Sequence, residues 1–170
     1  MRVVAGRFKG RTLHAPRGAA VRPTSDKVRG AIFNVLGDVD GLRVLDLFAG
    51  TGALGIEALS RGAADATFVD TDTSSVERNL ATIGVDAPVH RRDALRFLAT
   101  VDARYDLVFA DPPYSSPPSL GERLTQLLPA VLTGDRRIVT ESDKRNPLDL
   151  GLPLEFERDY GDTRIRIHRG

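Results

Sequence analysis

Short apolar segments alternate with amphipathic segments along most of this chain. The amphipathic segments have the apolar spacing of helices, and the apolar segments are short enough to be strands buried in a sheet. Strands that alternate with helices in this way are typical of a mostly parallel α/β sheet. We therefore predict strands at residues 43–47, 66–70, 88–91, 105–110 and 136–141, and helices near residues 53–61, 73–82, 93–99 and 119–132.

The N-terminal end has a different pattern. Residues 2–14 contain two short apolar segments on either side of a turn, which predicts a small β-hairpin. A helix follows, because Thr24 or Ser25 can cap its first turn and Gly37 is suited to end it. We expect residues 1–37, with this hairpin and helix, to form a unit distinct from the α/β domain.

The C-terminal end also departs from the alternating pattern. Residues 154–160 and 163–168 face each other across Gly161-Asp162, a dipeptide typical of turns. This arrangement predicts an antiparallel hairpin that extends the mostly parallel sheet. We therefore expect one α/β domain at residues 38–170 that ends in antiparallel strands.

The composition limits the kinds of protein that the chain can be. It has 170 residues, of which 41% are hydrophobic and 28% are charged, as in an ordinary domain with a core. No apolar run reaches the roughly 18–20 residues that a membrane span needs, and no apolar signal segment follows the first residues. We therefore expect a cytoplasmic protein without a membrane partner. Without an apolar surface stripe to form a dimer interface, we expect a monomer.

The chain has no cysteine, which excludes disulfides, thiolate zinc sites and cysteine nucleophiles. Its three histidines, His14, His90 and His168, are far apart and lack the spacing of metal ligands. We therefore expect no metal site.

The net charge of +1 hides a strong asymmetry between the two ends. Residues 1–29 hold eight basic side chains against one acidic side chain, so the rest of the chain is mildly acidic. A basic segment on an acidic body favours a polyanionic partner, although a merely solvated terminus gives the same pattern. The candidate phosphate-binding residues are Arg7, Lys9, Arg11, Arg17 and Arg22.

A glycine-rich turn after the first predicted strand of the domain indicates a nucleoside cofactor. Gly50 and Gly52 lie between a strand and a helix, where glycines let the backbone approach a ligand closely. Asp70 ends the next strand, where a carboxylate can accept the hydroxyls of a ribose. With Gly55 the turn also fits the dinucleotide pattern G-x-G-x-x-G, so a nicotinamide cofactor stays an alternative.

Two further residues favour a cofactor with a positive amino group. Asp46 lies within the strand, four residues before Gly50, and Phe48 stands between them. A carboxylate at this place suits a cation, whereas it would repel a pyrophosphate. A tight strand–helix turn without any ligand is the remaining alternative.

The sequence Asp111-Pro112-Pro113-Tyr114 follows a buried strand directly. Ligands of open α/β sheets bind at this end of the strands. The prolines stiffen the turn, so that Asp111 and a neighbouring carbonyl can accept the two hydrogens of an amino group. Tyr114 offers a flat surface on which a flipped base can stack. The segment resembles the D/N-P-P-Y/F/W motif of S-adenosylmethionine-dependent amino-methyltransferases, although a structural Pro-Pro turn is an alternative.

A third candidate group follows the predicted strand at 88–91. Asp93 can cap the helix that begins there, which needs no ligand. In methyltransferases with the same motifs, an Asp-Ala pair at this place contacts the adenine amino group of the cofactor. The resemblance therefore implies a cofactor contact for Asp93 and Ala94, and both roles are compatible.

The combination of motifs resembles one family more closely than the superfamily. The RsmD family of enzymes that methylate N2 of guanine in 16S ribosomal RNA has a similar N-terminal signature and similar glycine and Asp-Pro-Pro-Tyr motifs. The resemblance implies a Rossmann-like class I methyltransferase core with a C-terminal antiparallel hairpin and an N-terminal hairpin that helps to hold RNA. The segments that carry it are 4–11, 22–29, 32–34, 45–62 and 111–114.

The resemblance also implies how the parts act together. The S-adenosylmethionine would lie over Gly50 and Gly52, and residues around Thr24 would cover its methionine end. A flipped guanine would stack on Tyr114 and donate its N2 hydrogens to Asp111 and the Pro112 carbonyl. The alternatives are methylation of adenine N6 in DNA or RNA or of a protein glutamine, a nicotinamide-dependent oxidoreductase, and a non-catalytic RNA-binding assembly factor.

Overall fold

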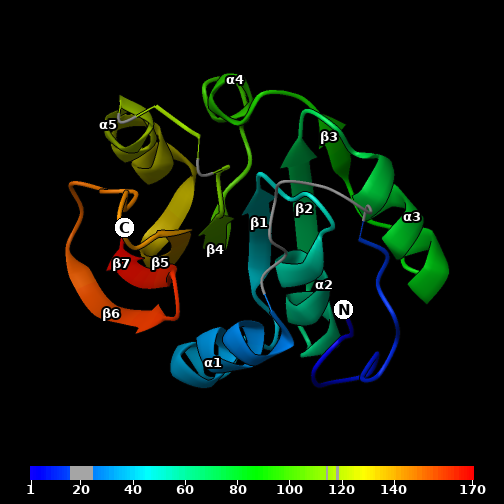
Figure 1. The fold of residues 1–170 in the computed structure, drawn as a ribbon. Helices are drawn as coiled ribbons and strands as arrows, with labels where there is room; N and C mark the ends of the chain where they lie inside the picture. Colours follow the sequence, from blue (N-terminus) through cyan, green and yellow to red (C-terminus); the bar gives the residue numbers. More distant parts are fainter. Residues whose placement is uncertain (16–24, 114, 118) are drawn as a thin grey trace.

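The computed structural model describes residues 1–15, 25–113, 115–117 and 119–170, the side chain of Asp135 excepted (Figure 1). Strands and helices alternate through the middle of the chain, as the apolar pattern predicts. The strands are β1 (Arg43–Leu47), β2 (Asp65–Asp70), β3 (Val89–Arg91), β4 (Tyr105–Ala110), β5 (Leu132–Asp143), β6 (Leu154–Tyr160) and β7 (Thr163–Arg169). The helices are α1 (Asp26–Leu36), α2 (Ala53–Ser60), α3 (Ser74–Ile83), α4 (Ala94–Leu98), α5 (Ser119–Leu127) and the 3-10 helix η1 (Leu128–Val131).

The seven strands form one sheet in the order β3-β2-β1-β4-β5-β7-β6. The first five strands pair in parallel, whereas β7 pairs antiparallel with both β5 and β6. The arrowheads of β1, β2 and β4 therefore point to the same edge of the sheet (Figure 1). The mostly parallel sheet and its antiparallel C-terminal hairpin are confirmed.

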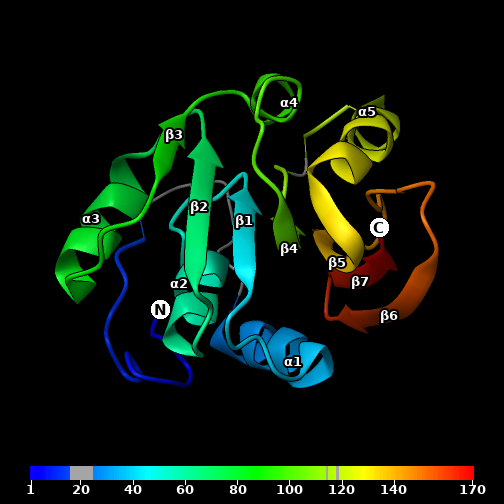
Figure 2. The same cartoon turned by 180° about the vertical axis from the view of Figure 1, so that it is seen from behind.

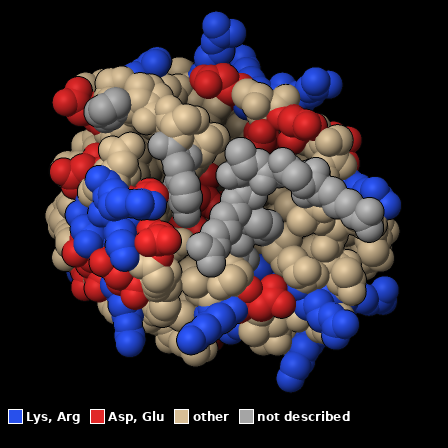
Figure 3. Space-filling view, viewed as in Figure 1, with Lys and Arg blue, Asp and Glu red and all other residues tan. Residues whose placement is uncertain are grey.

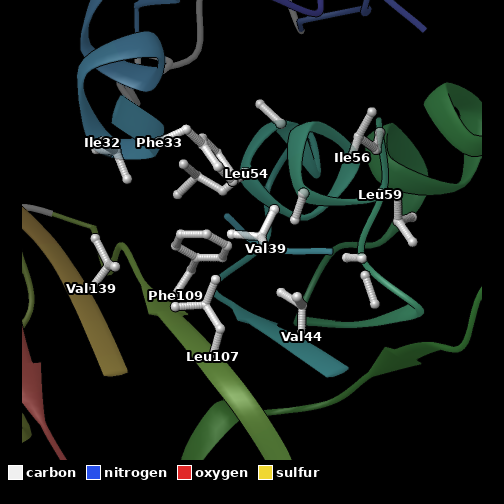
Figure 4. Packing of buried hydrophobic residues seen from close by; sticks show 14 of the residues in the cluster. Ile32, Phe33, Val39, Val44, Leu54, Ile56, Leu59, Leu107, Phe109 and Val139 are labelled. Atoms are coloured by element: carbon white, nitrogen blue, oxygen red, sulfur yellow. The ribbon is translucent and has the colours of Figure 1, made fainter. Parts of the chain in front are cut away.

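Two apolar clusters cover the two faces of the sheet, so the fold has three layers. On one face, α1, α2 and α3 pack on the strands, and the Phe33 ring of α1 lies 5.7 Å from the Phe109 ring of β4 (Figure 4). On the other face, α4, α5 and η1 pack on side chains such as Leu45 and Val108 (Figure 2). Alternate residues of β1 point to opposite faces, which is why Val44 belongs to one cluster and Leu45 to the other.

Two boundaries differ from the sequence prediction. The helix expected over 119–132 is α-helical only to Leu127 and then continues as the 3-10 helix η1. Pro129 lies in this 3-10 turn and has no N–H for an α-helical hydrogen bond. The strand expected at 136–141 is longer in both directions and spans Leu132–Asp143, because it pairs with β7 along its C-terminal half.

The N-terminal segment, residues 1–15, turns back on itself but forms less of a hairpin than expected. A single antiparallel bridge joins Arg2 to Thr12. Some of the intervening amides pair within the arm, as the Val3 amide does with the Arg11 carbonyl, but others bind the helix α2: Val4 and Ala5 donate to the Glu57 carboxylate at 2.8 and 3.0 Å. The segment then runs from beneath α2 up beside α3 (Figure 1). We refer to residues 1–15 as the arm.

A buried ion pair holds the arm and α1 on α2. The side chains of Glu57 and Arg29 are both fully buried, and Arg29 Nε lies 3.4 Å from Glu57 Oε2. Arg29 also donates to the Arg2 carbonyl and to Asp26, while Arg61 Nε donates to Glu57 at 2.8 Å. The helix α1 begins at the cap Ser25, as expected, and ends at Gly37 with φ of 73°. The arm, α1 and the sheet share one apolar cluster. The division of the chain into units at residues 1–37 and 38–170 stays a prediction.

The part of the chain that the structure describes has no helix that is long and apolar enough to cross a membrane. It also has no cluster of three or more His, Cys, Asp or Glu side chains arranged to hold a metal ion.

Replacing Glu57 by Gln tests the role of the buried pair. The substitution keeps the shape but leaves Arg29 without its buried counter-charge, which typically costs about 3–5 kcal/mol. We expect urea unfolding to show a loss of this size, whereas Glu122→Gln on the exposed side of α5 should change stability by less than about 0.5 kcal/mol. An effect of Glu57→Gln as small as that of the control would contradict this role.

Candidate active site

A cavity of about 270 Å³ lies at the carboxyl ends of β1, β2 and β4. The sequence motifs meet here, because parallel strands bring the residues that follow them to one edge of the sheet. The residues that line the cavity include six predicted cofactor residues and Asp111: Asp46, Phe48, Gly50, Asp70, Asp93, Ala94 and Asp111. Of the other two predicted cofactor residues, Gly52 is buried in the turn and Thr24 lies outside the described residues.

The glycine turn leaves β1 through backbone conformations that side chains rarely adopt. Phe48 has φ of 57°. Among the described residues it is the single non-glycine residue whose φ is positive. Gly50 and Gly52 have φ of 54° and 74°. The Ala49 amide donates to the Val69 carbonyl at 3.1 Å, which holds the turn against the end of β2. Strained backbone of this kind is held by its surroundings and is often found at ligand sites.

The positions of the motif need glycine for two different structural reasons. A Cβ on Gly52 would lie 2.6 Å from a methyl of Val76, and one on Gly55 would lie 2.4 Å from the Phe68 ring. These two positions therefore need glycine for packing. A Cβ on Gly50 would meet nothing closer than 3.9 Å, so that this residue instead leaves space and the required positive φ at the cavity.

Asp46 is a buried carboxyl group at the base of the cavity. Its side chain points to the α2 face of the sheet and accepts a hydrogen bond from the Gly55 amide at 2.9 Å. The pKa of Asp46 is raised to about 7, mainly because the carboxyl group is buried and in smaller part because of the Asp70 charge, against the lowering effect of the Gly55 hydrogen bond. A cationic ligand group beside it would supply the counter-charge that the protein does not.

Asp70 closes the glycine turn. One carboxylate oxygen accepts from the Gly50 amide at 2.8 Å, and the other accepts from the Asp72 amide at 3.0 Å. The oxygen that the Asp72 amide contacts also accepts from the Thr71 hydroxyl at 3.4 Å, whereas the oxygen beside Gly50 keeps a further lone pair for a ligand hydroxyl. The carboxylate is thus fixed in place at the end of β2, as recognition of a ribose requires.

Asp93 and Ala94 lie where the helix cap is confirmed and the cofactor contact stays a prediction. Asp93 caps α4, because its Oδ1 accepts from the Arg96 amide at 2.9 Å. Both residues also line the cavity, and Ala94 is buried. The cap therefore fixes the helix end at the wall of the cavity.

The Asp-Pro-Pro segment forms the wall between two cavities. Asp111 is partly exposed and lines the first cavity, Pro112 is buried and lines the second, and Pro113 lines both. The second cavity has a volume of about 160 Å³. Its other lining residues come from the loop between β4 and α5, from the end of β5 and from the loop that follows β5. They are Ser116, Pro117, Ser142, Asp143, Asn146, Pro147, Leu148 and Asp149.

The sequence reasoning missed several lining residues. Arg92 and Asp72 stand beside residues that were singled out, and proximity along the chain was the available signal. Ala15 of the arm also lines the cavity, which no local pattern indicates. The wall formed by Ser142 and Asn146 was missed because it comes from the end of β5 and the turn after it, far along the sequence from Asp111.

The predicted phosphate-binding residues of the arm are exposed where the structure describes them. Arg7, Lys9 and Arg11 all reach solvent, and the Arg7 guanidinium lies 4.4 Å from the centre of the Phe8 ring. In the space-filling view, basic side chains project at the top, right and bottom of this face, and acidic side chains lie both on the face and along its left edge (Figure 3). The predicted site residues Thr24, Arg17, Arg22 and Tyr114 lie outside the described residues.

The arrangement as a whole fits a nucleoside that carries positive charge. Five carboxyl groups and a single guanidinium line the first cavity within the described residues: Asp46, Asp70, Asp72, Asp93, Asp111 and Arg92. A pyrophosphate would be repelled by this charge, whereas an ammonium or a sulfonium would be attracted. The small and apolar lining, including Ala53 and Leu54, leaves space for a flat ring.

Comparison with known proteins gives concordant results. A family model described as "Conserved hypothetical protein 95" matches residues 1–169. Ribosomal RNA small subunit methyltransferase D of Escherichia coli K12 is 39% identical over 183 residues, which cover 99% of this chain and 89% of that protein. The Bacillus subtilis protein YlbH, named as a candidate rRNA methyltransferase, is 41% identical over 186 residues. The alignment covers 99% of this chain and 98% of YlbH. The structure of yhhF from Escherichia coli, described as a candidate methyltransferase, is similar with a TM-score of 0.85, 35% identity and coverage of 99% and 97%.

The raised pKa of Asp46 predicts a specific pH dependence of stability. The unfolded chain loses this proton near pH 4, but the folded protein keeps it to about pH 7. The unfolded state therefore binds fewer protons between these values, and stability falls as the pH rises through this window. Between pH 5 and pH 8, urea unfolding should show the wild type losing of the order of 3 kcal/mol more than Asp46→Asn. Equal pH profiles of the two proteins would mean that Asp46 is ionised in the folded state.

Proposed function

The chain belongs to the RsmD family of S-adenosylmethionine-dependent methyltransferases, and on this premise we propose that it methylates the exocyclic N2 of a guanine in 16S ribosomal RNA. The observation that carries the proposal is the Asp111–Pro113 wall, which separates an acidic nucleoside cavity from a second cavity. Such a wall allows a methyl donor and an acceptor base to meet across one carboxylate. A substrate in the small ribosomal subunit would place the reaction in the cytoplasm.

The first cavity supports S-adenosylmethionine as the donor. When bound, this cofactor supplies an electrophilic methyl group on a sulfonium. Asp46 would hold its amino group, Asp70 the ribose hydroxyls, and Asp93 with Ala94 the adenine, while Phe48, Gly50 and Gly52 shape the turn beneath it. Thr24 stays a predicted contact on the methionine end. Binding should favour the ionised form of Asp46 because an ammonium stabilises a neighbouring carboxylate.

The Asp-Pro-Pro-Tyr segment supports an exocyclic amine as the acceptor. The lone pair of such an amine is delocalised into the base and is a poor nucleophile. Asp111 and the Pro112 carbonyl would accept its two N–H groups, which favours rehybridisation and directs the lone pair at the methyl group. The acceptor nitrogen would gain the methyl group that the cofactor supplies, and the proton that it loses would pass to the Asp111 carboxylate and from there to solvent. Positioning and fixed charge supply most of the rate enhancement, and no covalent enzyme intermediate is needed.

The second cavity supports a base flipped out of its stack. It lies directly behind Pro112 and Pro113, on the side away from Asp46. Its volume of about 160 Å³ suits one base rather than a second nucleoside. In the proposal Tyr114 would stack on this base, with Ser142 and Asn146 on the opposite wall.

The arm supports an RNA partner. Arg7, Lys9 and Arg11 are exposed on a segment that also reaches the cofactor cavity through Ala15. Phosphate contacts of this kind hold a nucleic acid in register without reading its sequence. We include Arg17 and Arg22 in the proposed RNA contact on sequence grounds.

The family favours methyl transfer over the hydride transfer of a nicotinamide enzyme, and the acidic cavity argues against a pyrophosphate. The chemistry of Asp111 does not distinguish between acceptors, because an adenine N6 or a glutamine side chain presents the same NH₂ group. The basic arm favours RNA over a protein acceptor.

Replacing Asp111 by Ala separates catalysis from cofactor binding. We expect S-adenosylmethionine to bind with an affinity within about threefold of the wild type, because the other cofactor contacts remain. Methyl transfer to a 16S ribosomal RNA fragment should fall by at least about 10²-fold, the usual effect of losing one transition-state contact. Calorimetric titration and a methyl-transfer assay test the two expectations, and Asp111→Asn, which keeps one acceptor oxygen, should retain more activity. Joint loss of binding and activity in Asp111→Ala would show that Asp111 is a cofactor ligand.

Reversing the charge of three arm residues tests the RNA contact. A triple variant with Glu at positions 7, 9 and 11 should bind the RNA fragment more weakly, and the slope of log K against log salt should fall by about 0.7 for each lost phosphate contact. The matched control carries Glu at Arg104, Arg123 and Arg158, which are exposed away from the arm. Unchanged affinity and slope in the arm variant, or equal losses in both variants, would remove the arm from the interface.

A further inference from the structure

Asn79 is a buried side chain that joins the arm to the cofactor turn. It lies in α3 and has no exposed surface. Its Nδ2 donates to the Thr51 carbonyl at 2.8 Å and to the His14 carbonyl at 3.0 Å, and its Oδ1 accepts from the His14 amide at 2.7 Å. One amide group therefore connects three backbone groups from two segments far apart in the sequence.

Both segments contact the cofactor cavity beside these bonds. Thr51 lies between Gly50 and Gly52 and lines the cavity, as does Ala15, the residue after His14. The helix α3 also packs on the glycine turn through Val76. A methyl group of Val76 occupies the space that a Cβ on Gly52 would need. The position of the arm at His14 and the position of the glycine turn are thus set by one helix.

The chemistry of the contact requires an amide. Two hydrogen bonds to one backbone residue, one donated and one accepted, need a donor and an acceptor side by side. An Asp at this position could accept from the His14 amide but would face two carbonyl oxygens, those of His14 and Thr51. An Ala would leave all three backbone groups without this partner, at a place where water has little access.

We propose that Asn79 is a positioning residue that couples occupancy of the cofactor cavity to the docking of the arm at His14. A ligand that fixes Thr51 fixes Asn79, and Asn79 in turn fixes the His14 backbone. Because binding couplings are reciprocal, an arm held in place by RNA strengthens ligand binding in the cavity. This inference rests on the proposed function for the identity of the ligand. Asn79 touches no reacting atom, so its role is positional.

The first half of the arm has its own attachment, which makes the coupling testable. Val4 and Ala5 donate to Glu57, and Phe8 donates to Ser60, without any contribution from Asn79. A change at Asn79 should therefore loosen His14 and leave the Val4 and Ala5 amides protected. A general loss of stability would instead loosen both regions together.

The experiment is amide hydrogen exchange of the full chain with and without saturating S-adenosylhomocysteine. In the wild type, the ligand should slow exchange of the His14 amide by roughly tenfold, a coupling within the usual range. In Asn79→Ala, exchange at His14 should be fast with or without the ligand. In Asn79→Asp the His14 amide keeps its acceptor but the His14 carbonyl loses its donor, so the ligand-free protection should fall less than in Asn79→Ala, and the ligand effect should be lost with the bond to Thr51.

Calorimetric titration of the same proteins supplies the second readout. Affinity for S-adenosylhomocysteine should fall by roughly tenfold in both Asn79 variants. The matched controls, Asn34→Ala and Asn34→Asp, change an exposed residue of α1 and should behave as the wild type in both measurements. Wild-type protein that binds the ligand without slower exchange at His14, or an Asn79→Ala variant that keeps the slowing, would overturn the coupling alone. Failure of the wild type to bind S-adenosylhomocysteine would overturn the proposed function together with it.

Discussion

One buried carboxylate, that of Glu57 in α2, holds the arm and α1 in place. Burial makes a lone charge costly, so the carboxylate needs the Arg29 guanidinium and the donors around it: two arm amides and Arg61. These partners come from the arm, from α1 and from the residue that caps the C-terminal end of α2. Because α2 begins directly after Gly52, the same helix fixes the start of the cofactor turn. The arm and the site therefore share one support.

The candidate site contains two features that lower the stability of the folded protein. Asp46 is a carboxyl group in the core, and Phe48 has a backbone conformation that favours glycine. Neither is required by the sheet, since apolar residues in ordinary conformations fill the neighbouring strands. Both become understandable at a site that receives a cation and must keep its backbone close to the ligand. The surrounding close packing of α2 and α3 against the sheet holds this strained turn in its shape.

Much of the fold and of the site could be predicted because it depends on local patterns. Apolar spacing located the strands, and the residues after β1, β2 and β4 had to meet because parallel strands share an edge. The long β5, the sparse pairing of the arm and the Asn79 contacts depend on partners distant in sequence. A signal for Asn79 did exist, because it occupies the apolar stripe of α3 formed by Val76, Leu80 and Ile83. A polar residue in such a stripe needs buried partners, but the pattern alone cannot name them.

The place of β7 in the sheet has a consequence for synthesis on the ribosome. This strand is the last of the seven to be made, yet it lies inside the sheet and pairs on both sides. Until it emerges, the outer side of β5 has unpaired N–H and C=O groups, which can recruit strands of other chains. The strands β1, β2 and β4 that carry the cofactor residues are complete well before this stage. Nascent chains are therefore most exposed to misassembly when the cofactor site already has its strands.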